Sequence, residues 1–138
     1  MNFEPTSLVV PVRPNDLDSL GHVNNAIVLE YLEAGRWAWL AHHRLKRTGR
    51  VLPVVSRLEI DYRREILPPE IVVATRLEVD EAFLDPEAIS YRAVFHQTVV
   101  ATGAAELAAE AIVKVAFIDA TARSLRTIQD FLQQTFEP

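Results

Sequence analysis

The sequence predicts an α+β domain in which one short strand and one long helix precede four further strands. Apolar residues repeat at the spacing of a helix after residue 24, whereas runs typical of strands dominate the chain after residue 50. No linker, internal repeat or low-complexity tract divides the 138 residues. We therefore expect a single domain that spans residues 1–138.

The first strand is expected over Ser7–Arg13, where Pro11 would have to lie at a sheet edge or at a bulge. The helix follows from Asn24 or Asn25 to about Arg47, with Thr48-Gly49 as its stop. Its apolar face consists of Ile27, Val28, Tyr31, Leu32 and Leu40.

A glycine, Gly35, lies in the middle of the expected helix and costs about 1 kcal/mol relative to alanine. A helix that keeps such a glycine often packs closely against a neighbouring element, so we expect a close approach at this point.

Three segments after the helix are expected to form strands. The first is Val51–Glu65, as one long strand or a bent pair, and Pro68-Pro69 ends it. The second is Ile71–Val79, and the third runs from about Ala88 to His96 after a turn at Asp80–Glu87.

The segment Ala101–Phe117 contains conflicting signals. Its alanine-rich part, residues 104–111, favours a helix by propensity, whereas residues 112–118 are typical of a strand. Residues Arg123–Phe136 are expected to form a short amphipathic helix at the end of the chain.

Composition limits the class of protein. The chain is 49% hydrophobic and 24% charged, as in ordinary globular domains, and it has no cysteine for a disulfide, a thiolate nucleophile or a sulfur-bound metal. Its net charge of −5 argues against a general nucleic-acid binder. No apolar run approaches the roughly 20 residues of a membrane span, and the N-terminus does not resemble a signal peptide. We expect a cytoplasmic protein.

The segment from Asp16 to Asn25 carries the densest set of reactive groups: two carboxylates, a histidine and two amides just before the helix. A carboxylate at such a position can act as a base or a nucleophile, and the free N–H groups of the helix start can bind the group under attack. The structural alternative is that the aspartates shape a turn and that Asn24 or Asn25 caps the helix.

This segment also resembles a known family. Asp16-x-Asp18-x-x-Gly21-His22-Val23-Asn24-Asn25, followed by Tyr31-Leu32-Glu33 and Arg36, is similar to the start of the hotdog-fold thioesterases of the 4-hydroxybenzoyl-CoA thioesterase-like family. Ile60-Asp61-Tyr62-Arg63-Arg64-Glu65 is similar to the strand after their helix, and both blocks are also similar to plant acyl-acyl-carrier-protein thioesterases. The resemblance implies an antiparallel sheet wrapped around one long central helix, and therefore a strand over residues 101–117.

The resemblance also implies roles for the loop residues. Asp18 occupies the position of the catalytic aspartate, either as general base or as nucleophile, while Asp16 is expected to shape the loop. His22 matches the catalytic histidine of the plant enzymes, although Leu20 stands where their asparagine lies. The backbone N–H near Asn25 would bind the thioester oxygen.

Three residues of the second block are candidates for substrate contact. Arg63 and Arg64 alternate in direction along the strand, so one of them could bind phosphates of coenzyme A. Glu65 matches a glutamate that some relatives use in catalysis. Asn24, in the first block, is a further candidate for holding the loop or the thioester. The alternative for Glu65 is a solvated strand end, and Ile66 replaces the cysteine of the plant pattern.

The sequence therefore predicts a thioester hydrolase that releases a carboxylic acid and a thiol, with no cofactor and no metal. The substrate is expected to be an acyl-CoA or an acyl-carrier-protein thioester. The resemblance implies a homodimer or homotetramer with active sites at the dimer interface. Two alternatives stay open: a non-catalytic acyl-thioester-binding hotdog protein, and another hotdog enzyme such as a dehydratase. The acyl group is not predicted.

Overall fold

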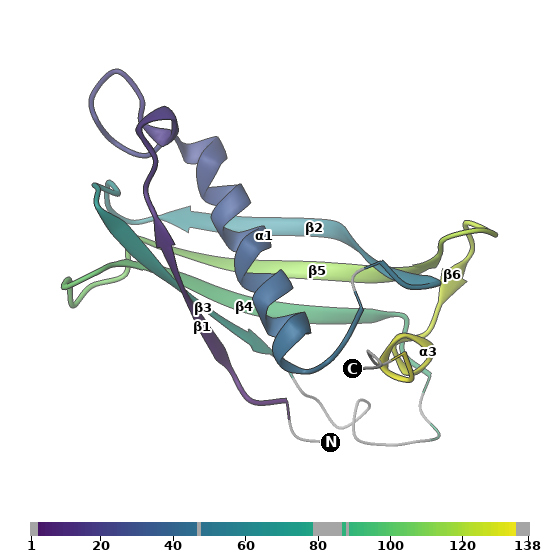
Figure 1. Cartoon of the computed structure of the whole chain (residues 1–138). Coiled ribbons are helices and arrows are strands. Elements are labelled where there is room, and N and C mark those ends of the chain that lie inside the picture. Colours follow the sequence, from purple (N-terminus) through teal and green to yellow (C-terminus); the bar gives the residue numbers. More distant parts are fainter. Residues whose placement is uncertain (1–2, 47, 79–86, 88, 135–138) are drawn as a thin grey trace.

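A computed structural model of the chain describes residues 3–46, 48–78, 87 and 89–134. An antiparallel sheet of six strands is crossed on one face by the long helix α1 (Figure 1). This arrangement confirms the predicted hotdog fold. The turn expected at Asp80–Glu87 lies mostly outside the described residues.

The strands of the sheet follow the spatial order β1-β3-β4-β5-β2, and the short β6 pairs with β5. Because β1 has only one neighbour, Pro11 at its end lies at a sheet edge, as predicted. The elements are β1 (Thr6–Pro11), the 3-10 helix η1 (Pro14–Asp16), α1 (Asn25–His42), β2 (Val51–Tyr62), β3 (Glu70–Leu77), β4 (Arg92–Ala101), β5 (Ala109–Asp119), β6 (Leu125–Arg126) and α3 (Ile128–Leu132).

The core lies between α1 and the sheet. Side chains alternate along β3, β4 and β5, so every second residue is buried beneath the helix. A Cβ atom on Gly35 would lie 2.6 Å from Cγ1 of Val73, which confirms the expected close approach of helix and sheet. The largest fully buried side chains are Trp39, Phe117, Leu32, Ile71 and Ile128.

The helix ends at His42, so the predicted end near Arg47 is wrong. The N–H of Leu45 donates to the carbonyl of Leu40 over 2.8 Å, and Arg44 has a φ of 58°. This is the geometry with which a helix commonly closes, and glycine usually supplies the positive φ. Because an arginine takes this conformation, no glycine marks the end of the helix in the sequence.

The boundaries of β4 and β5 also differ from the prediction. The strand expected to end at His96 continues to Ala101, and the next strand begins only at Ala109. Gly103 has a φ of 85°, and the N–H of Ala104 donates to the carbonyl of Ala101 over 2.9 Å. This turn divides the predicted strand over residues 101–117, and the pairing of β4 with β5 overrides the helical propensity of the alanines.

The final helix is shorter than predicted. Residues 125–126 form β6 against β5, and α3 begins only at Ile128. Thr127 caps α3: its hydroxyl accepts from the N–H of Asp130 over 3.1 Å, and the Asp130 carboxylate accepts the N–H of Thr127 in return. Arg126 reaches the same carboxylate with Nε at 3.0 Å.

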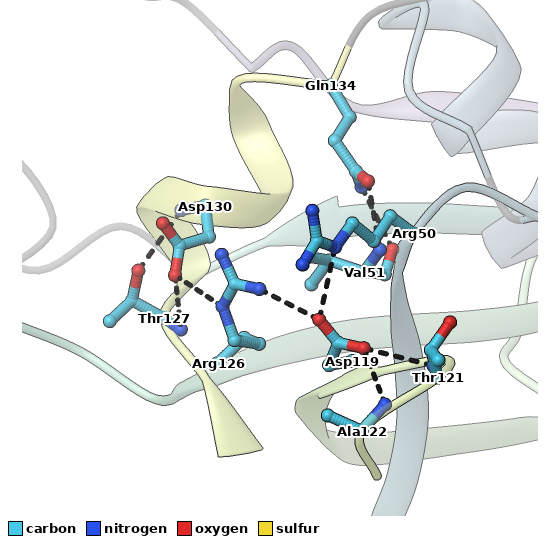
Figure 2. A network of polar contacts seen from close by, with 9 residues as sticks. All are labelled: Arg50, Val51, Asp119, Thr121, Ala122, Arg126, Thr127, Asp130 and Gln134. Atoms are coloured by element: carbon cyan, nitrogen blue, oxygen red, sulfur yellow. Dashed lines mark hydrogen bonds and ion pairs between the residues drawn. The ribbon is translucent and has the colours of Figure 1, made fainter. Parts of the chain in front are cut away.

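A buried carboxylate joins this terminal segment to the sheet (Figure 2). Asp119, at the end of β5, accepts from the N–H groups of Thr121 and Ala122 at 2.9 and 2.8 Å. Its other oxygen accepts hydrogen bonds from the guanidinium groups of Arg126 at 2.9 Å and Arg50 at 3.3 Å. The hydrogen bonds from Ala122 and Thr121, with a smaller contribution from Arg50, lower the pKa of Asp119 to about 2.

We predict that Asp119→Asn lowers the melting temperature at pH 7 by at least about 5 °C, because it removes the charge that two arginines contact. The stabilisation belongs to the ionised form, so it is present above the ordinary pKa of 3.8 and lost as the pH falls toward about 2. Thermal unfolding of both proteins between pH 7 and pH 2 measures this difference.

Asp61→Asn, which neutralises an exposed carboxylate of β2, serves as the matched control and should shift the melting temperature little. A gap between wild type and Asp119→Asn that stays constant down to pH 2 would show that the ionised carboxylate is not the source of the stabilisation.

Candidate active site

The loop between η1 and α1 is organised around the buried carboxylate of Asp16. Its oxygens accept from the N–H and the guanidinium of Arg13 at 2.9–3.3 Å and from the hydroxyl of Tyr31 at 2.7 Å. The carbonyl of Asp16 also accepts from the N–H of Asn24 over 2.8 Å. These contacts hold both ends of the loop against α1 and agree with the structural role expected for Asp16.

Burial of Asp16 favours its protonated form, but the hydrogen bonds from Arg13 and Tyr31 outweigh this effect. The pKa of Asp16 therefore lies below its ordinary value. Burial, together with the neighbouring carboxylate, raises the pKa of Tyr31, so the phenol remains a hydrogen-bond donor at neutral pH.

Asp18 is exposed and uses one of its two oxygens within the loop. Oδ1 accepts from the N–H groups of Leu20 and His22 at 2.9 and 3.1 Å, and Gly21 makes the turn with a φ of 79°. Oδ2 has no hydrogen-bond partner among the residues that the structure describes. One oxygen thus fixes the position of the carboxylate, and the other is available for chemistry.

The start of α1 provides a backbone donor. The side chain of Asn24 accepts from the N–H of Ala26 over 2.9 Å, so Asn24 is the helix cap. The N–H of Asn25 donates to no group within the described chain, and the carbonyl of Asn25 accepts from the hydroxyl of Tyr62 over 2.7 Å. The helix therefore begins with one free N–H next to the loop, where the helix dipole favours negative charge.

A surface depression with a volume of about 390 Å³, here called the Asp18 depression, collects most of the predicted residues. Asn24 does not line it, which is consistent with a capping role. The predicted site residues in its wall are Asp18, His22, Asn25, Arg63, Arg64 and Glu65, and the other lining residues are Val23, Val28, Tyr62 and Ile66.

A backbone contact brings the two sequence blocks together. The N–H of Val23 donates to the carbonyl of Ile66 over 2.8 Å, which places the segment after β2 beside the loop. Nε2 of His22 then lies 2.6 Å from Oε2 of Glu65. A carboxylate at this distance holds the imidazole in one orientation.

The two arginines that follow β2 are exposed and form ion pairs with acids of the β4–β5 region. Arg63 pairs with Glu110 of β5, and Arg64 pairs with Glu106. Ion pairs at such exposed positions contribute little to stability. The guanidinium groups can therefore exchange these carboxylates for a phosphate at low cost.

Tyr62 is the residue that sequence analysis missed. Tyr62 belongs to the second block, but nothing in its position along the sequence indicates that its hydroxyl reaches the start of the helix. In the structure the hydroxyl holds the carbonyl of Asn25 while the ring lines the Asp18 depression. Burial raises the pKa of Tyr62, so the phenol donates at neutral pH.

Comparison with known families identifies the chain. The family model of the thioesterase-like superfamily matches residues 12–136. The chain belongs to this superfamily. Among curated proteins, no sequence matches the chain.

Solved structures of thioesterases share this fold. One from Thermus thermophilus, in complex with coenzyme A and zinc, is 27% identical, with a TM-score of 0.71 over 92% of this chain and 87% of that one. A 1,4-dihydroxy-2-naphthoyl-CoA thioesterase from Synechocystis is 16% identical, with a TM-score of 0.75 over 98% of this chain and 100% of that one. A DHNA-CoA thioesterase from Staphylococcus aureus is 14% identical, with a TM-score of 0.77 over 92% of this chain and 83% of that one.

The superfamily supports a thioester hydrolase and confirms the resemblance to hotdog thioesterases, whereas the similarity to plant enzymes stays a prediction. Within the described residues, no group of three or more potential metal-binding side chains was found. None of the helices in the described part of the chain has the length and hydropathy of a membrane span.

Proposed function

We propose that the protein is an acyl-CoA thioesterase, that residues 1–138 form one thioesterase domain, and that the Asp18 depression is its active site. The observation that carries the proposal is the convergence of an anchored carboxylate and a free helix N–H in the wall of one depression. A thioester carbonyl bound there would have an attacking group on one side and an oxyanion donor on the other.

In the general-base route, Oδ2 of Asp18 takes a proton from water as the water oxygen attacks the carbonyl carbon. The N–H of Asn25 stabilises the negative charge that develops on the carbonyl oxygen. The carbon–sulfur bond then breaks, and the proton passes to the leaving thiolate to give a carboxylic acid and a thiol. In the nucleophilic route, Asp18 itself attacks the carbonyl carbon and expels the thiolate. Water then hydrolyses the mixed anhydride, which regenerates the Asp18 carboxylate and gives the carboxylic acid and the proton that the thiolate takes up.

His22 and Glu65 complete the site in this proposal. The ion pair with Glu65 keeps the histidine beside the loop, where its N–H can donate to the substrate or to the attacking water. Asn24 contributes indirectly, since it caps the helix whose first N–H faces the reaction.

Asp18→Asn tests the proposal without disturbing the loop, because an amide oxygen can still accept from Leu20 and His22. We expect kcat to fall at least about 100-fold, equivalent to about 2.7 kcal/mol, because the amide is neither base nor nucleophile. Steady-state hydrolysis of the best acyl-CoA, with thermal unfolding in parallel, measures both effects.

Asp18→Ala is the matched variant, since it removes the reactive group and the loop contacts together. It should be as inactive as Asp18→Asn and less stable. Near wild-type turnover by Asp18→Asn would refute the catalytic role and favour a protein that binds thioesters without hydrolysing them.

The choice of coenzyme A as carrier rests on Arg63 and Arg64, since its phosphates need cationic partners near the active site. We expect either alanine variant to raise the KM for acyl-CoA by about three- to tenfold with little change in kcat, because ground state and transition state share a phosphate contact. A short thioester without the nucleotide should be hydrolysed as by the wild type.

Arg76→Ala, which removes an exposed arginine from β3, controls for the loss of surface charge. Equal losses on both substrates would assign the two arginines to the structure of the loop. An acyl-carrier-protein thioester tested beside acyl-CoA decides between the two carriers.

We further propose that the protein is a homodimer or a pair of such dimers. The strand β2 is twelve residues long and, among the described residues, pairs only with β5, so one edge of the sheet has no partner strand in that part of the chain. Val54 and Val55 of β2 and Trp37 of α1 are 43–47% exposed beside that edge. A second copy of the chain would cover both the edge and these apolar side chains.

Sedimentation velocity at micromolar concentration should therefore give the mass of a dimer or a tetramer. Hydrolysis followed in the same sample tests whether assembly and activity go together. A fully active monomer would contradict both the assembly and the expectation that the active sites lie at a subunit interface.

A further inference from the structure

A second cavity lies between α1, β2 and α3 and shares no lining residue with the Asp18 depression. Its volume is about 410 Å³, within the range of small-molecule sites. Most of its wall is apolar and is supplied by residues such as Phe95, Phe117 and Phe131. Trp37, Val54 and Val55, which the proposed second copy of the chain covers, line the same cavity at its outer side. We call it the Arg36 cavity, after the one arginine in its wall.

Arg36 is only 9% exposed and has no carboxylate within 4 Å among the described residues. One of its five donors is used: NH1 donates to Oε1 of Gln97 over 3.0 Å. Burial lowers the pKa of Arg36, and the charge of Glu33 opposes this shift. An arginine nevertheless stays protonated, so the cavity wall contains a mostly buried positive charge that no described carboxylate contacts directly, while Glu33 lies elsewhere in the same wall.

The contact with Gln97 orients this charge. The amide nitrogen of Gln97 donates to the carbonyl of Leu32 over 2.8 Å and to the hydroxyl of Thr75 over 2.9 Å. The amide oxygen is therefore fixed and holds the guanidinium from one side only. Gln97 could be satisfied by any neutral donor, so its presence does not account for a charged residue here.

A second polar group in the same wall lacks a partner. Nε1 of Trp39 is buried and makes no hydrogen bond within the described chain, although a buried indole N–H usually has an acceptor. A ligand with oxygen acceptors would provide the partners that the unused donors of Arg36 lack.

We propose that the Arg36 cavity binds a carboxylate carried on an apolar chain or ring. The carboxylate pairs with the unused donors of Arg36, and the apolar part packs against the aromatic and aliphatic wall. Arg36 lies about 16 Å along the helix from Asn25, so a ligand of this chemistry can come from two sources. It is either the distal carboxylate of a long acyl group or a free carboxylic acid.

The test uses the intrinsic fluorescence of the two tryptophans, Trp37 and Trp39, because both line the cavity and the chain has no others. Octanoate and octanol have chains of equal length and differ in the charge of the head group. We expect the wild type to bind octanoate at least about tenfold more tightly than octanol and Arg36→Met to lose this preference. Arg92→Met, which removes an exposed arginine from β4, should keep it.

Equal binding of the two ligands by the wild type, or an unchanged preference in Arg36→Met, would overturn the proposal. Arg36→Lys keeps a positive charge with fewer donors and should retain part of the preference. If Arg36→Met does not fold, the wild type and Arg36→Lys still test the proposal. A lysine variant that prefers octanoate over octanol as strongly as the wild type counts against the pairing of the carboxylate with Arg36.

A hydrolysis assay decides the source of the carboxylate. This assay rests on the proposed function, whereas the fluorescence binding assay does not. Dicarboxylic and monocarboxylic acyl-CoA thioesters of equal chain length are compared at several lengths. An Arg36-dependent preference for the dicarboxylic series supports the distal carboxylate of the substrate. If the two series are hydrolysed at equal rates and octanoate still binds, the ligand of the cavity is a free carboxylic acid. If no thioester is hydrolysed but octanoate still binds, the proposed thioesterase activity is refuted and the Arg36 cavity remains a carboxylate site.

Discussion

The buried carboxylate of Asp16 is the contact on which the arrangement of the loop beside the Asp18 depression depends. It accepts hydrogen bonds from Arg13 before the loop and from Tyr31 within α1, so it joins the end of β1 to the helix. Burying a charge is costly unless the charge is paired and hydrogen-bonded, and here both conditions are met. The loop is therefore held at both ends, and the residues between them take one conformation.

The two aspartates of the loop have opposite environments, which suits them to different roles. Asp16 is buried and has all its contacts within the protein, whereas Asp18 is exposed and leaves one oxygen without a protein partner. The buried aspartate fixes the loop, and the anchored but exposed one is available to react. At the opposite end of the sheet, Asp119 joins α3 to β5 and so positions part of the wall of the Arg36 cavity.

Local patterns predicted the order of strands and helix, because periodicity and a helix cap depend on neighbouring residues. The hotdog architecture and most residues of the Asp18 depression were predicted from the resemblance of two sequence blocks to a known family. The helix end was missed because Arg44 adopts a conformation that usually needs glycine. Tyr62 and Arg36 were not identified as site residues because their roles depend on contacts between distant segments, which spacing along the chain does not report.

Hydrolysis of acyl thioesters in the Asp18 depression is tested by a hydrolysis panel with the wild-type protein. The panel contains short, long and aromatic acyl-CoA thioesters and one acyl-carrier-protein thioester, with release of the free thiol as the readout. We expect saturable hydrolysis of at least one substrate with a kcat/KM of at least about 10⁴ M⁻¹s⁻¹. Release of thiol no faster than the uncatalysed reaction for every member of the panel would contradict it.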